Sequence, residues 1–334
     1  MYDVQHSERT RATTKRLDTL HSASYFSPAV SRALAEVGLE HPSGGYLASR
    51  AAALGRVPAS VVAATFYSFN VDFISEFVPA CWETAAPEAV LAARLRGVEA
   101  MVAEIFAADG VETAALAAAA AEAVALLEPV LAAMPPDGRP LFAAHAEALT
   151  EAVSGSEGPL APFVRLWAAA TLLREFRGDG HIAALIGHDL TGLESVILHT
   201  ATGTTFTQRA TLKSRGWPAE RWGACVEQLI DRGLLARRIE DAPGAGSGEA
   251  APGSGSGAGD DSDGRLQLAD EAIALRAAIE DATDHSVARS WSVLEEPEQV
   301  RLAELAQQLA RPVLKAGVFP ARAFAASAPF AQRS

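Results

Sequence analysis

Prolines that can open helices and glycines that can close them punctuate the N-terminal part of the chain. This pattern constrains the fold more than any other feature. Pro28, Pro58 and Pro87 each precede an apolar stretch of helical periodicity, and Gly38 and Gly55 each follow one. Proline is tolerated in the first turn of a helix, and glycine is favoured just beyond the last turn. Because similar signals recur towards the C-terminus, the sequence predicts a mostly α-helical fold.

The composition is that of a folded and acidic protein. Hydrophobic residues make up 49% of the 334 residues, which is enough to bury a core and excludes a disordered chain. The formal net charge is −13 at pH 7. An acidic chain is a poor partner for nucleic acid unless its positive charges are gathered locally. The composition therefore disfavours nucleic acid as a partner without excluding it.

No segment has the pattern of a membrane span, a secretory signal or a disulfide framework. The alanine-rich stretch from Ala114 to Leu127 is short for a bilayer and contains Glu122. The first residues lack the apolar core of a signal peptide. Cys81 and Cys225 are too few for a disulfide framework or a four-ligand zinc site. We therefore expect a cytoplasmic, bacterial protein that contacts no membrane.

Shifts in composition divide the chain into three parts. Residues 12–106 and 159–316 carry most of the helical signals, and residues 107–158 form an alanine- and leucine-rich hairpin with a linker. Residues 240–264 are rich in Gly, Ser, Ala and Pro. Such a segment can bury almost nothing, so we expect a flexible loop there.

The first and third parts share an order of short motifs. An Ala-Leu pair followed by glycine occurs at Ala33–Gly38 and again at Ala184–Gly187, and Tyr46–Gly55 is similar to Val196–Gly203. Repetition in the same order indicates an internal duplication. The two halves would then form a pseudo-dimer within one chain, with the helical hairpin between them. Two unrelated helical bundles of similar composition are the alternative.

The third part has the element order of a winged helix-turn-helix. It contains a helix from Leu190, a short helix at 207–214, a turn at 216–218, a helix at 219–231 and two extended segments at 232–235 and 266–268. In this order, residues 160–310 resemble the MarR family. The whole chain resembles fused, MarR-like helix-turn-helix proteins of actinobacteria, which carry an Arg-Gly-Asp-Gly-His segment. The resemblance implies two winged-helix-like halves, DNA binding and a small-molecule pocket near a dimer axis.

The predicted recognition helix is poorly suited to DNA. A helix that contacts bases and phosphates presents basic or amide side chains, whereas residues 219–231 present Glu220 and Glu227 beside Arg221. The equivalent segment of the first half, 61–69, is almost wholly apolar. The wing loop carries six acids and no base: Glu240, Asp241, Glu249, Asp260, Asp261 and Asp263. If the chain does bind DNA, the expected contacts are Arg221, Arg237 and Arg238.

The segment from Arg174 to His181 is the densest polar cluster in an apolar setting. Arg174 and Arg177 can bind a carboxylate or phosphate through paired hydrogen bonds. Asp179 would orient His181, and these two residues are the candidate catalytic pair for acid–base chemistry. The alternative is structural: Asp179 caps a helix that begins at His181, and Arg177 lies on the surface.

The repeat places His21 and Tyr25 opposite this cluster. In a pseudo-dimer the two segments would face each other and enclose one asymmetric pocket. We therefore expect His21, Tyr25 and Tyr67 to bind ligand together with Arg174 and Arg177. The alternative for the histidine and the tyrosines is ordinary core packing.

No motif indicates a metal or a cofactor. His181, His188 and His199 lack the spacing of a zinc-binding pair. The Gly178–Gly180 segment follows no strand, so it does not form a dinucleotide loop. No nucleophile elbow occurs in a strand–turn–helix setting. We expect neither a metal nor a cofactor.

Together these features predict a protein that binds a small anionic or aromatic metabolite between its two halves and has lost DNA reading. The pocket would serve binding alone or a reaction of specialised metabolism. The alternative is a MarR-type DNA-binding transcriptional regulator that responds to a ligand. A third hypothesis is an interaction protein without a pocket. The chain would act as a monomeric pseudo-dimer or as a homodimer.

Overall fold

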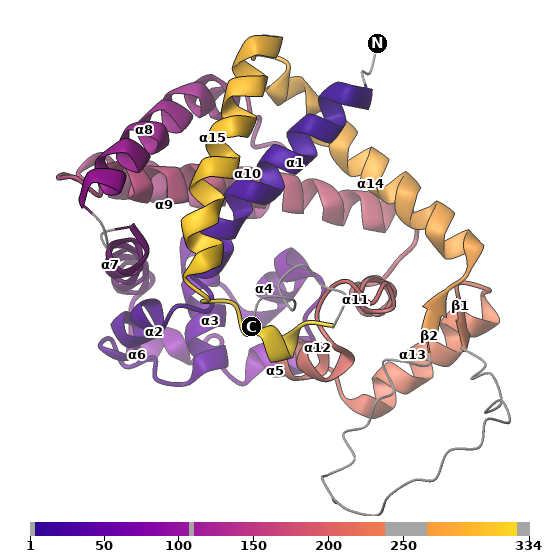
Figure 1. The fold of residues 1–334 in the computed structure, drawn as a ribbon. Coiled ribbons are helices and arrows are strands. Elements are labelled where there is room, and N and C mark those ends of the chain that lie inside the picture. Colours follow the sequence, from indigo (N-terminus) through magenta and orange to yellow (C-terminus); the bar gives the residue numbers. More distant parts are fainter. Residues whose placement is uncertain (1–3, 107–109, 238–265, 326–334) are drawn as a thin grey trace, which may run out of the picture. The chain divides into compact units, whose positions relative to one another are not determined.

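Helices make up most of the protein (Figure 1). The computed structural model describes residues 4–106, 110–237 and 266–325. Within these ranges it contains fifteen α-helices and two short β-strands. The prediction of a mostly α-helical fold is confirmed.

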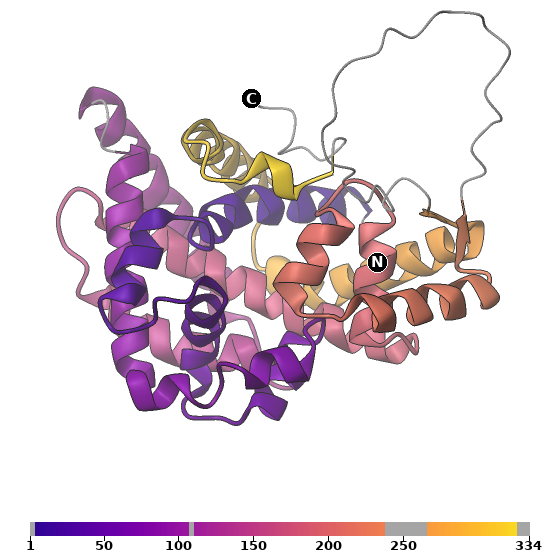
Figure 2. The ribbon, with the colours of Figure 1, turned by 90° about the horizontal axis from the view of Figure 1, so that it is seen from below.

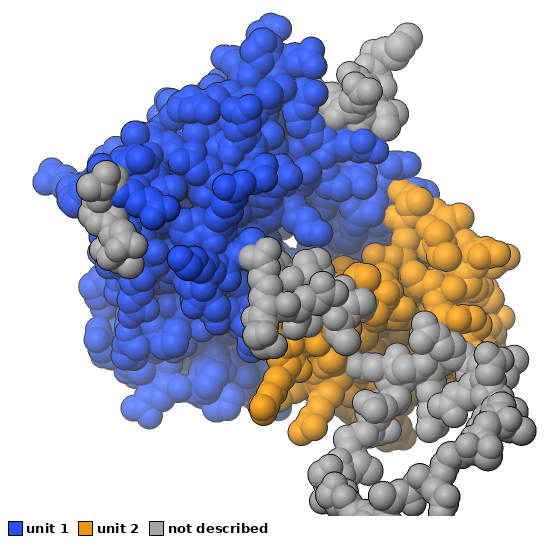
Figure 3. Space-filling model, in the orientation of Figure 1, with its two compact units in different colours: residues 1–191, 278–320 blue, residues 192–277, 321–334 orange. Residues whose placement is uncertain are grey.

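The chain is divided into two compact units (Figure 3). Unit 1 comprises residues 1–191 and 278–320, and unit 2 comprises residues 192–277 and 321–334. This division differs from the three parts expected from composition. Unit 1 contains the first two parts and also takes residues from the third. Helix α14 (Asp270–Trp291) contributes to both units.

The N-terminal helices of unit 1 begin and end where the sequence indicates. Ser27 accepts a hydrogen bond from the Ala29 N–H (3.2 Å), and Pro28 occupies the first turn of α2. Gly38 follows that helix with a φ of +89°, a conformation that favours glycine. The elements are α1 (Val4–Ala23), α2 (Pro28–Ala35), α3 (Pro42–Ala51), η1 (Ala52–Leu54), α4 (Ala59–Phe66), α5 (Val71–Ser75), α6 (Cys81–Thr84) and α7 (Pro87–Phe106).

Four further long helices belong wholly to unit 1. They are α8 (Gly110–Ala132), α9 (Pro140–Ser154), α10 (Ala161–Gly187) and α15 (Glu296–Lys315). Helix α10 is central, because it packs against α1, α8 and α9 and buries Phe163, Trp167 and Phe176. Helix α15 lies alongside α1 in Figures 1 and 2, although the two are far apart in the sequence.

The Arg-Gly-Asp-Gly-His segment does not interrupt a helix, contrary to the alternative in which a new helix begins at His181. It lies inside α10, which continues to Gly187. A glycine in a helix interior costs only about 1 kcal/mol, which the packing of a central helix can offset. A side chain at position 180 would also clash with α14, since a Cβ there would lie 2.4 Å from Oγ of Ser286.

Helix α8 owes its high hydropathy to alanine. By length and composition alone, Glu112–Ala132 could cross a membrane, with a mean hydropathy of 1.7. A third of the most apolar part of this helix is buried inside the protein (33%), where α8 packs against α10 and α15. Glu122 also pairs with Arg301 of α15 at 2.6 Å. These contacts hold α8 within unit 1.

Unit 2 contains three short helices, then a pair of antiparallel strands. The elements are α11 (Gly192–Thr200), α12 (Gln208–Arg215), α13 (Ala219–Asp231), β1 (Leu235–Arg237) and β2 (Leu266–Leu268). Leu235 pairs with Leu268 across the strands. Trp222 and Leu229 of α13 are buried with Ile197 of α11. The expected wing loop, residues 240–264, lies outside the described residues.

The chain returns to unit 2 near its C-terminus. Phe324 forms a β-bridge with Phe206, and their rings stack with centroids 4.5 Å apart. The Ala325 N–H donates to the Thr205 carbonyl (2.7 Å). The short helix η3 (Ala321–Ala323) precedes this contact.

Candidate functional site

Arg50, Arg174 and Glu175 form a charged network inside unit 1. The side chains of Arg50 (α3) and Glu175 (α10) are 5% and 1% exposed. Glu175 accepts hydrogen bonds from Arg50 Nη2 (3.3 Å) and from Arg174 Nη1 (2.7 Å). Burial alone would raise the pKa of Glu175, but Arg174 and Arg50 outweigh it and hold the pKa well below its ordinary range. The carboxylate is therefore ionised and forms ion pairs with both guanidinium groups.

Arg94 of α7 lies in the same interior without a carboxylate of its own. It is 2% exposed. Its Nη1 donates to the Ser49 carbonyl (3.2 Å) and lies 3.4 Å from Nε2 of His145, and its guanidinium stands 4.9 Å from the Trp167 ring centroid. Among the described residues, Nη2 has no hydrogen-bond partner. A buried guanidinium without an anion is costly to the fold, and burial lowers its pKa.

The neighbouring His145 does not add a second positive charge. Its Nδ1 lies 2.9 Å from the carbonyl of Leu141, which can only accept, so Nδ1 carries the hydrogen. Its Nε2 is then an acceptor that faces Arg94. Burial lowers the pKa of His145 to about 4, so the ring is neutral near pH 7.

A directed chain of hydrogen bonds joins α1 to α10. Thr171 donates its hydroxyl hydrogen to the Trp167 carbonyl (2.8 Å), so its oxygen accepts from Nδ1 of His21 (2.8 Å). Burial lowers the pKa of His21 well below its ordinary value, and the ring is neutral. Nε2 of His21 therefore accepts the hydroxyl hydrogen of Tyr25 (2.7 Å). The structure thus brings together His21 and Tyr25, two of the predicted ligand-binding residues.

A cavity of about 60 Å³ is lined by Arg94 and Tyr25. Its walls come from the residues that follow α1, from α2 and the segment after it, from the start of α3 and from α7. At its rim Glu40, His41 and Pro42 are exposed. One water needs about 10–15 Å³ on this measure, so the space holds about four to six water-sized groups. The polar side chains that line it are Ser24, Tyr25, Ser31, Glu40, His41, Tyr46, Ser49 and Arg94.

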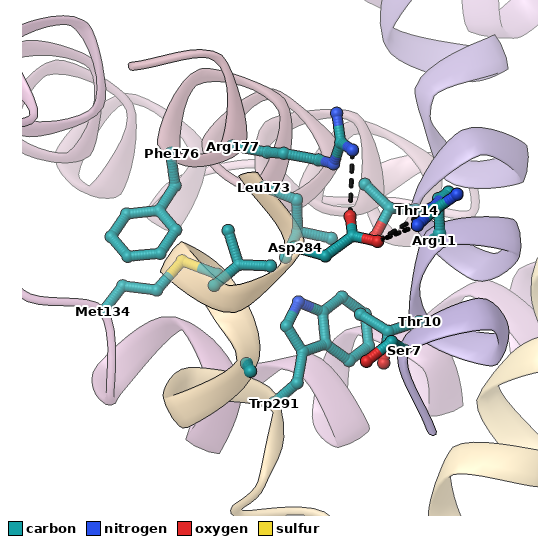
Figure 4. Close-up of a pocket in the computed structure, with 12 residues that line it drawn as sticks. Ser7, Thr10, Arg11, Thr14, Met134, Leu173, Phe176, Arg177, Asp284 and Trp291 are labelled. Atoms are coloured by element: carbon teal, nitrogen blue, oxygen red, sulfur yellow. Dashed lines mark hydrogen bonds and ion pairs between the residues drawn. The ribbon is translucent and has the colours of Figure 1, made fainter. Parts of the chain in front are cut away.

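Arg177, another predicted ligand-binding residue, is held by two carboxylates of α14. Its Nη2 donates to Glu280 (2.7 Å) and to Asp284 (2.9 Å), and Asp284 also accepts from Nε of Arg11 (2.8 Å). Figure 4 shows Asp284 between the two arginines, with the Trp291 ring beside them. The cavity here is about 10 Å³, which is room for one water. Arg177 is therefore neutralised by carboxylates of this chain, and the cavity beside it is too small for a metabolite.

The predicted catalytic residues Asp179 and His181 point to different neighbours. Oδ2 of Asp179 accepts from the Phe142 N–H (2.9 Å) in the first turn of α9. Nδ1 of His181 lies 2.9 Å from Oγ1 of Thr283 in α14. Residues two apart on a helix face opposite ways, so Asp179 does not orient His181. Burial raises the pKa of Asp179 to about 6.

Tyr67 and Arg174, the remaining predicted ligand-binding residues, lie apart from each other. Tyr67 follows the last residue of α4, and its hydroxyl donates to the Leu190 carbonyl. It lines neither of the two cavities described above. Arg174 belongs to the Glu175 network and does not line the larger cavity.

Unit 2 contains a helix–turn–helix. Helix α12 ends at Gly216, whose φ of +69° is left-handed, and Pro218 precedes α13. Helix α12 exposes Arg209 and Lys213. The exposed face of α13 carries three acids and one base, and its polar residues are Glu220, Arg221, Glu227, Gln228 and Asp231.

The residues expected to contact DNA have partners within unit 2. The guanidinium of Arg221 stands 5.4 Å from the Trp217 ring centroid. Arg237 of β1 forms an ion pair with Glu227 of α13. Arg238 lies outside the described residues. The positive charge that this face could offer a phosphate is thus reduced by its own acids.

No group of three His, Cys, Asp or Glu side chains is placed to hold a metal ion in the part of the chain that the structure describes. Both cysteines are buried as free thiols, and burial raises the pKa of each to about 11. Neither thiol is therefore a ready nucleophile at neutral pH.

Sequence reasoning missed Arg94, Glu175 and His145. One signal was present for Arg94: it falls on the same stripe of α7 as Val90 and Val98, which are buried. A charged residue on an apolar stripe is either paired inside or placed for a ligand. The sequence predicted that Arg174 and Arg177 bind an anionic ligand, and it did not indicate that Glu175 is the carboxylate with which Arg174 pairs.

The profile of a helix-turn-helix family matches residues 10–320, which is nearly the whole chain. Searches of curated proteins and of solved structures give no match.

Proposed function

Because the chain belongs to the helix-turn-helix family, we propose that it is a ligand-binding member of that family whose ligand is a small anion held in the cavity of unit 1. The observation that carries this proposal is Arg94, a buried guanidinium that lines the cavity and lacks an anionic partner. DNA reading by α13 is weakened or lost.

The charges of the interior favour an anion. Three arginines, Arg50, Arg94 and Arg174, lie near two carboxylates, Glu175 and Asp18, so one positive charge is in excess even when both carboxylates are ionised. The neutral His145 and His21 leave this balance unchanged. A buried charge without a partner destabilises a fold by several kcal/mol, about 3–5 when one partner of a pair is removed. A carboxylate or similar anion in the cavity would offset that cost.

The size of the cavity favours a small ligand. About four to six water-sized groups fit in 60 Å³. This is the size of a short aliphatic acid and is too small for a large aromatic metabolite. Tyr25 and Tyr46, whose ring centroids are 5.1 Å apart, would form an aromatic wall of the site.

Calorimetry and thermal unfolding with sodium propanoate test this proposal. We expect propanoate to raise the midpoint of thermal unfolding and to give a measurable Kd. Arg94→Met should weaken binding at least about thirtyfold, because a carboxylate loses a buried charge partner. The same substitution should leave the ligand-free protein as stable as before or more stable, since it removes an unpaired charge.

Arg32→Met is the matched control. Arg32 forms a surface ion pair with Glu104 and does not line the cavity, so this variant should bind propanoate normally. If Arg94→Met strongly destabilises the ligand-free protein and no short carboxylate binds the unaltered protein, Arg94 is a structural residue and the proposal is wrong.

A second candidate function is that of a MarR-type DNA-binding transcriptional regulator that responds to the same ligand. The observation in its favour is α12, which exposes Arg209 and Lys213 directly before the turn that leads to α13. Binding of the protein to its own upstream DNA would then weaken steeply with salt. Replacing Arg209 and Lys213 with alanine should flatten that salt dependence by about two charges. No salt-sensitive binding would leave only the ligand-binding function.

The order of the helices supports an internal duplication of MarR-like halves. In the first half a long helix, α1, precedes the shorter α2, α3 and α4, and the long α7 follows later. In the second half α10 is followed by α11, α12 and α13, and then by the long α14 and α15. The strands β1 and β2 occupy the wing position in the second half. In the first half α5 and α6 stand at that place.

A further inference from the structure

The hydroxyl group of Tyr25 has its hydrogen engaged, so only its oxygen is left for a further hydrogen bond. Its single hydrogen is donated to Nε2 of His21, whose Nδ1–H is in turn donated to Thr171. Thr171 cannot reverse this order, because its own hydrogen bond ends on the Trp167 carbonyl, which only accepts. The oxygen of Tyr25 can therefore accept a further hydrogen bond but cannot donate one.

Arg94, in contrast, can only donate hydrogen bonds. A guanidinium only donates, and Nη2 of Arg94 has no acceptor among the described residues. Both side chains line the same cavity. Each is held by a further hydrogen bond, Arg94 by the Ser49 carbonyl and Tyr25 by His21. The cavity is thus lined by one residue whose guanidinium can only donate and favours an anion, and by one whose hydroxyl oxygen can still accept.

We propose that Tyr25 is a specificity-determining residue and that it selects small carboxylic acids that carry a hydroxyl group. The carboxylate of the ligand would face Arg94, and its hydroxyl would donate to the Tyr25 oxygen. This inference rests on the proposed function, because it presupposes an anion at Arg94. It adds the chemistry of the rest of the ligand.

The cavity volume limits the carbon skeleton. A three-carbon hydroxy acid has six non-hydrogen atoms, which corresponds to the about four to six water-sized groups that fit. An aromatic hydroxy acid exceeds this volume. The proposal therefore commits to the aliphatic class.

Two isosteric pairs of acids test the role of Tyr25 without any substitution. Racemic 2-hydroxypropanoate is compared with 2-methylpropanoate, and 3-hydroxypropanoate with butanoate, by calorimetry on the full chain. Within each pair a methyl group replaces the hydroxyl, so volume and charge are kept. We expect at least one hydroxy acid to bind about tenfold or more tightly than its methyl isostere, because the isostere leaves the Tyr25 oxygen unpaired.

Tyr25→Phe then assigns the preference to the hydroxyl of Tyr25. The variant should lose the discrimination within the pair and should still bind propanoate in an Arg94-dependent manner. Tyr67→Phe makes the same chemical change at a tyrosine that does not line the cavity, and it should keep the discrimination. If Tyr25→Phe fails to fold, the isosteric pairs decide on the unaltered protein.

The outcomes separate the two proposals. If both members of each pair bind equally, the role of Tyr25 is wrong while the anion site stands. If the methyl isosteres or an aromatic hydroxy acid bind best, the inferred ligand class is wrong. If no short acid binds at all, the proposed function fails, and the inference about Tyr25 fails with it.

Discussion

Nη1 of Arg94 lies 3.4 Å from Nε2 of His145, and this contact requires a neutral imidazole. The Leu141 carbonyl fixes the hydrogen on Nδ1, so Nε2 offers a lone pair to the guanidinium. Protonation of His145 would place a second cation beside a buried one. The neighbourhood of Arg94 is therefore sensitive to acid.

The pKa of His145 predicts that stability falls on acidification. In the folded protein the pKa is lowered to about 4, whereas the unfolded chain takes up a proton near 6.5. The unfolded state thus binds more protons between these values, and folding becomes less favourable as the pH falls from 6.5 to 4. A shift of this size corresponds to about 3 kcal/mol.

Urea unfolding at several pH values checks this prediction. Relative to the unaltered protein, His145→Gln should gain stability as the pH falls from 6.5 to 4, whereas His285→Gln, at an exposed position, should not. The comparison is made between proteins because Asp179 contributes with the opposite sign over part of this range. A His145→Gln variant with the pH dependence of the unaltered protein would contradict the account of His145.

Asp179 predicts a pH effect of the opposite sign. Burial raises its pKa to about 6 from an ordinary value of 3.8. The folded state then binds more protons than the unfolded state between these values, so stability falls as the pH rises from about 4 to 6. The effect amounts to about 3 kcal/mol, and above pH 6 the folded protein holds a buried carboxylate.

Asp179→Asn isolates the contribution of the Asp179 carboxylate to the pH dependence of stability. The amide oxygen can still accept from the Phe142 N–H at the start of α9, so the variant should be at least as stable as the unaltered protein at pH 7. Relative to the unaltered protein, it should gain about 3 kcal/mol of unfolding free energy as the pH rises from 4 to 6. A strong loss of stability at pH 7 would mean that the charge on Asp179 is needed to cap α9.

Gly97 is predicted to be a tight contact between α7 and α2. A Cβ at this position would lie 2.6 Å from the Cα of Val30, which is backbone and cannot turn aside. Gly97→Ala should therefore destabilise the protein by about 1–3 kcal/mol. Gly178→Ala is the matched control in a helix, because the nearest atom to its Cβ, Oε2 of Glu175, is 4.0 Å away.

Chemical unfolding distinguishes these two glycines. Gly178→Ala should be neutral or should stabilise α10 by up to about 1 kcal/mol, since alanine favours the helix. Equal effects of the two substitutions would show that helix propensity, and not the approach of α2, governs Gly97.

Asp284 is predicted to be the anion that holds Arg11 and Arg177. The Asp284 side chain is 5% exposed, while the Arg177 side chain is 24% exposed. Asp284→Ala leaves two partly buried cations without this carboxylate and should cost about 1–3 kcal/mol. Glu104→Ala breaks the surface pair with Arg32 and should change stability by less than about 0.5 kcal/mol. Similar losses in thermal unfolding for both variants would contradict this assignment.

Local signals in the sequence were sufficient for many element boundaries. Ser27 and Pro28 mark the start of α2, and Gly216 and Pro218 mark the turn before α13. These signals act over a few residues, so they can be recognised in the sequence without knowledge of the tertiary structure. The two glycines inside α10 were misleading, because tertiary packing against α9 and α14 overrides their low helix propensity.

The candidate site was only partly predictable. His21 and Tyr25 were identified from the repeat, but their partner Thr171 and the acceptor role of the Tyr25 oxygen depend on hydrogen bonds between distant segments. Arg177 was expected at a pocket, whereas Glu280 and Asp284 of α14 neutralise it. Which arginine is paired and which is not depends on contacts between residues about a hundred positions apart, and no local pattern encodes them.

A crystal structure of the protein with 2-hydroxypropanoate is the most direct test of the central claim. The account predicts a carboxylate oxygen about 2.7–3.2 Å from a guanidinium nitrogen of Arg94, and the ligand hydroxyl within hydrogen-bonding distance of the Tyr25 oxygen. Water alone in this cavity at a ligand concentration that raises the unfolding midpoint, or the acid bound elsewhere on the protein, would contradict it.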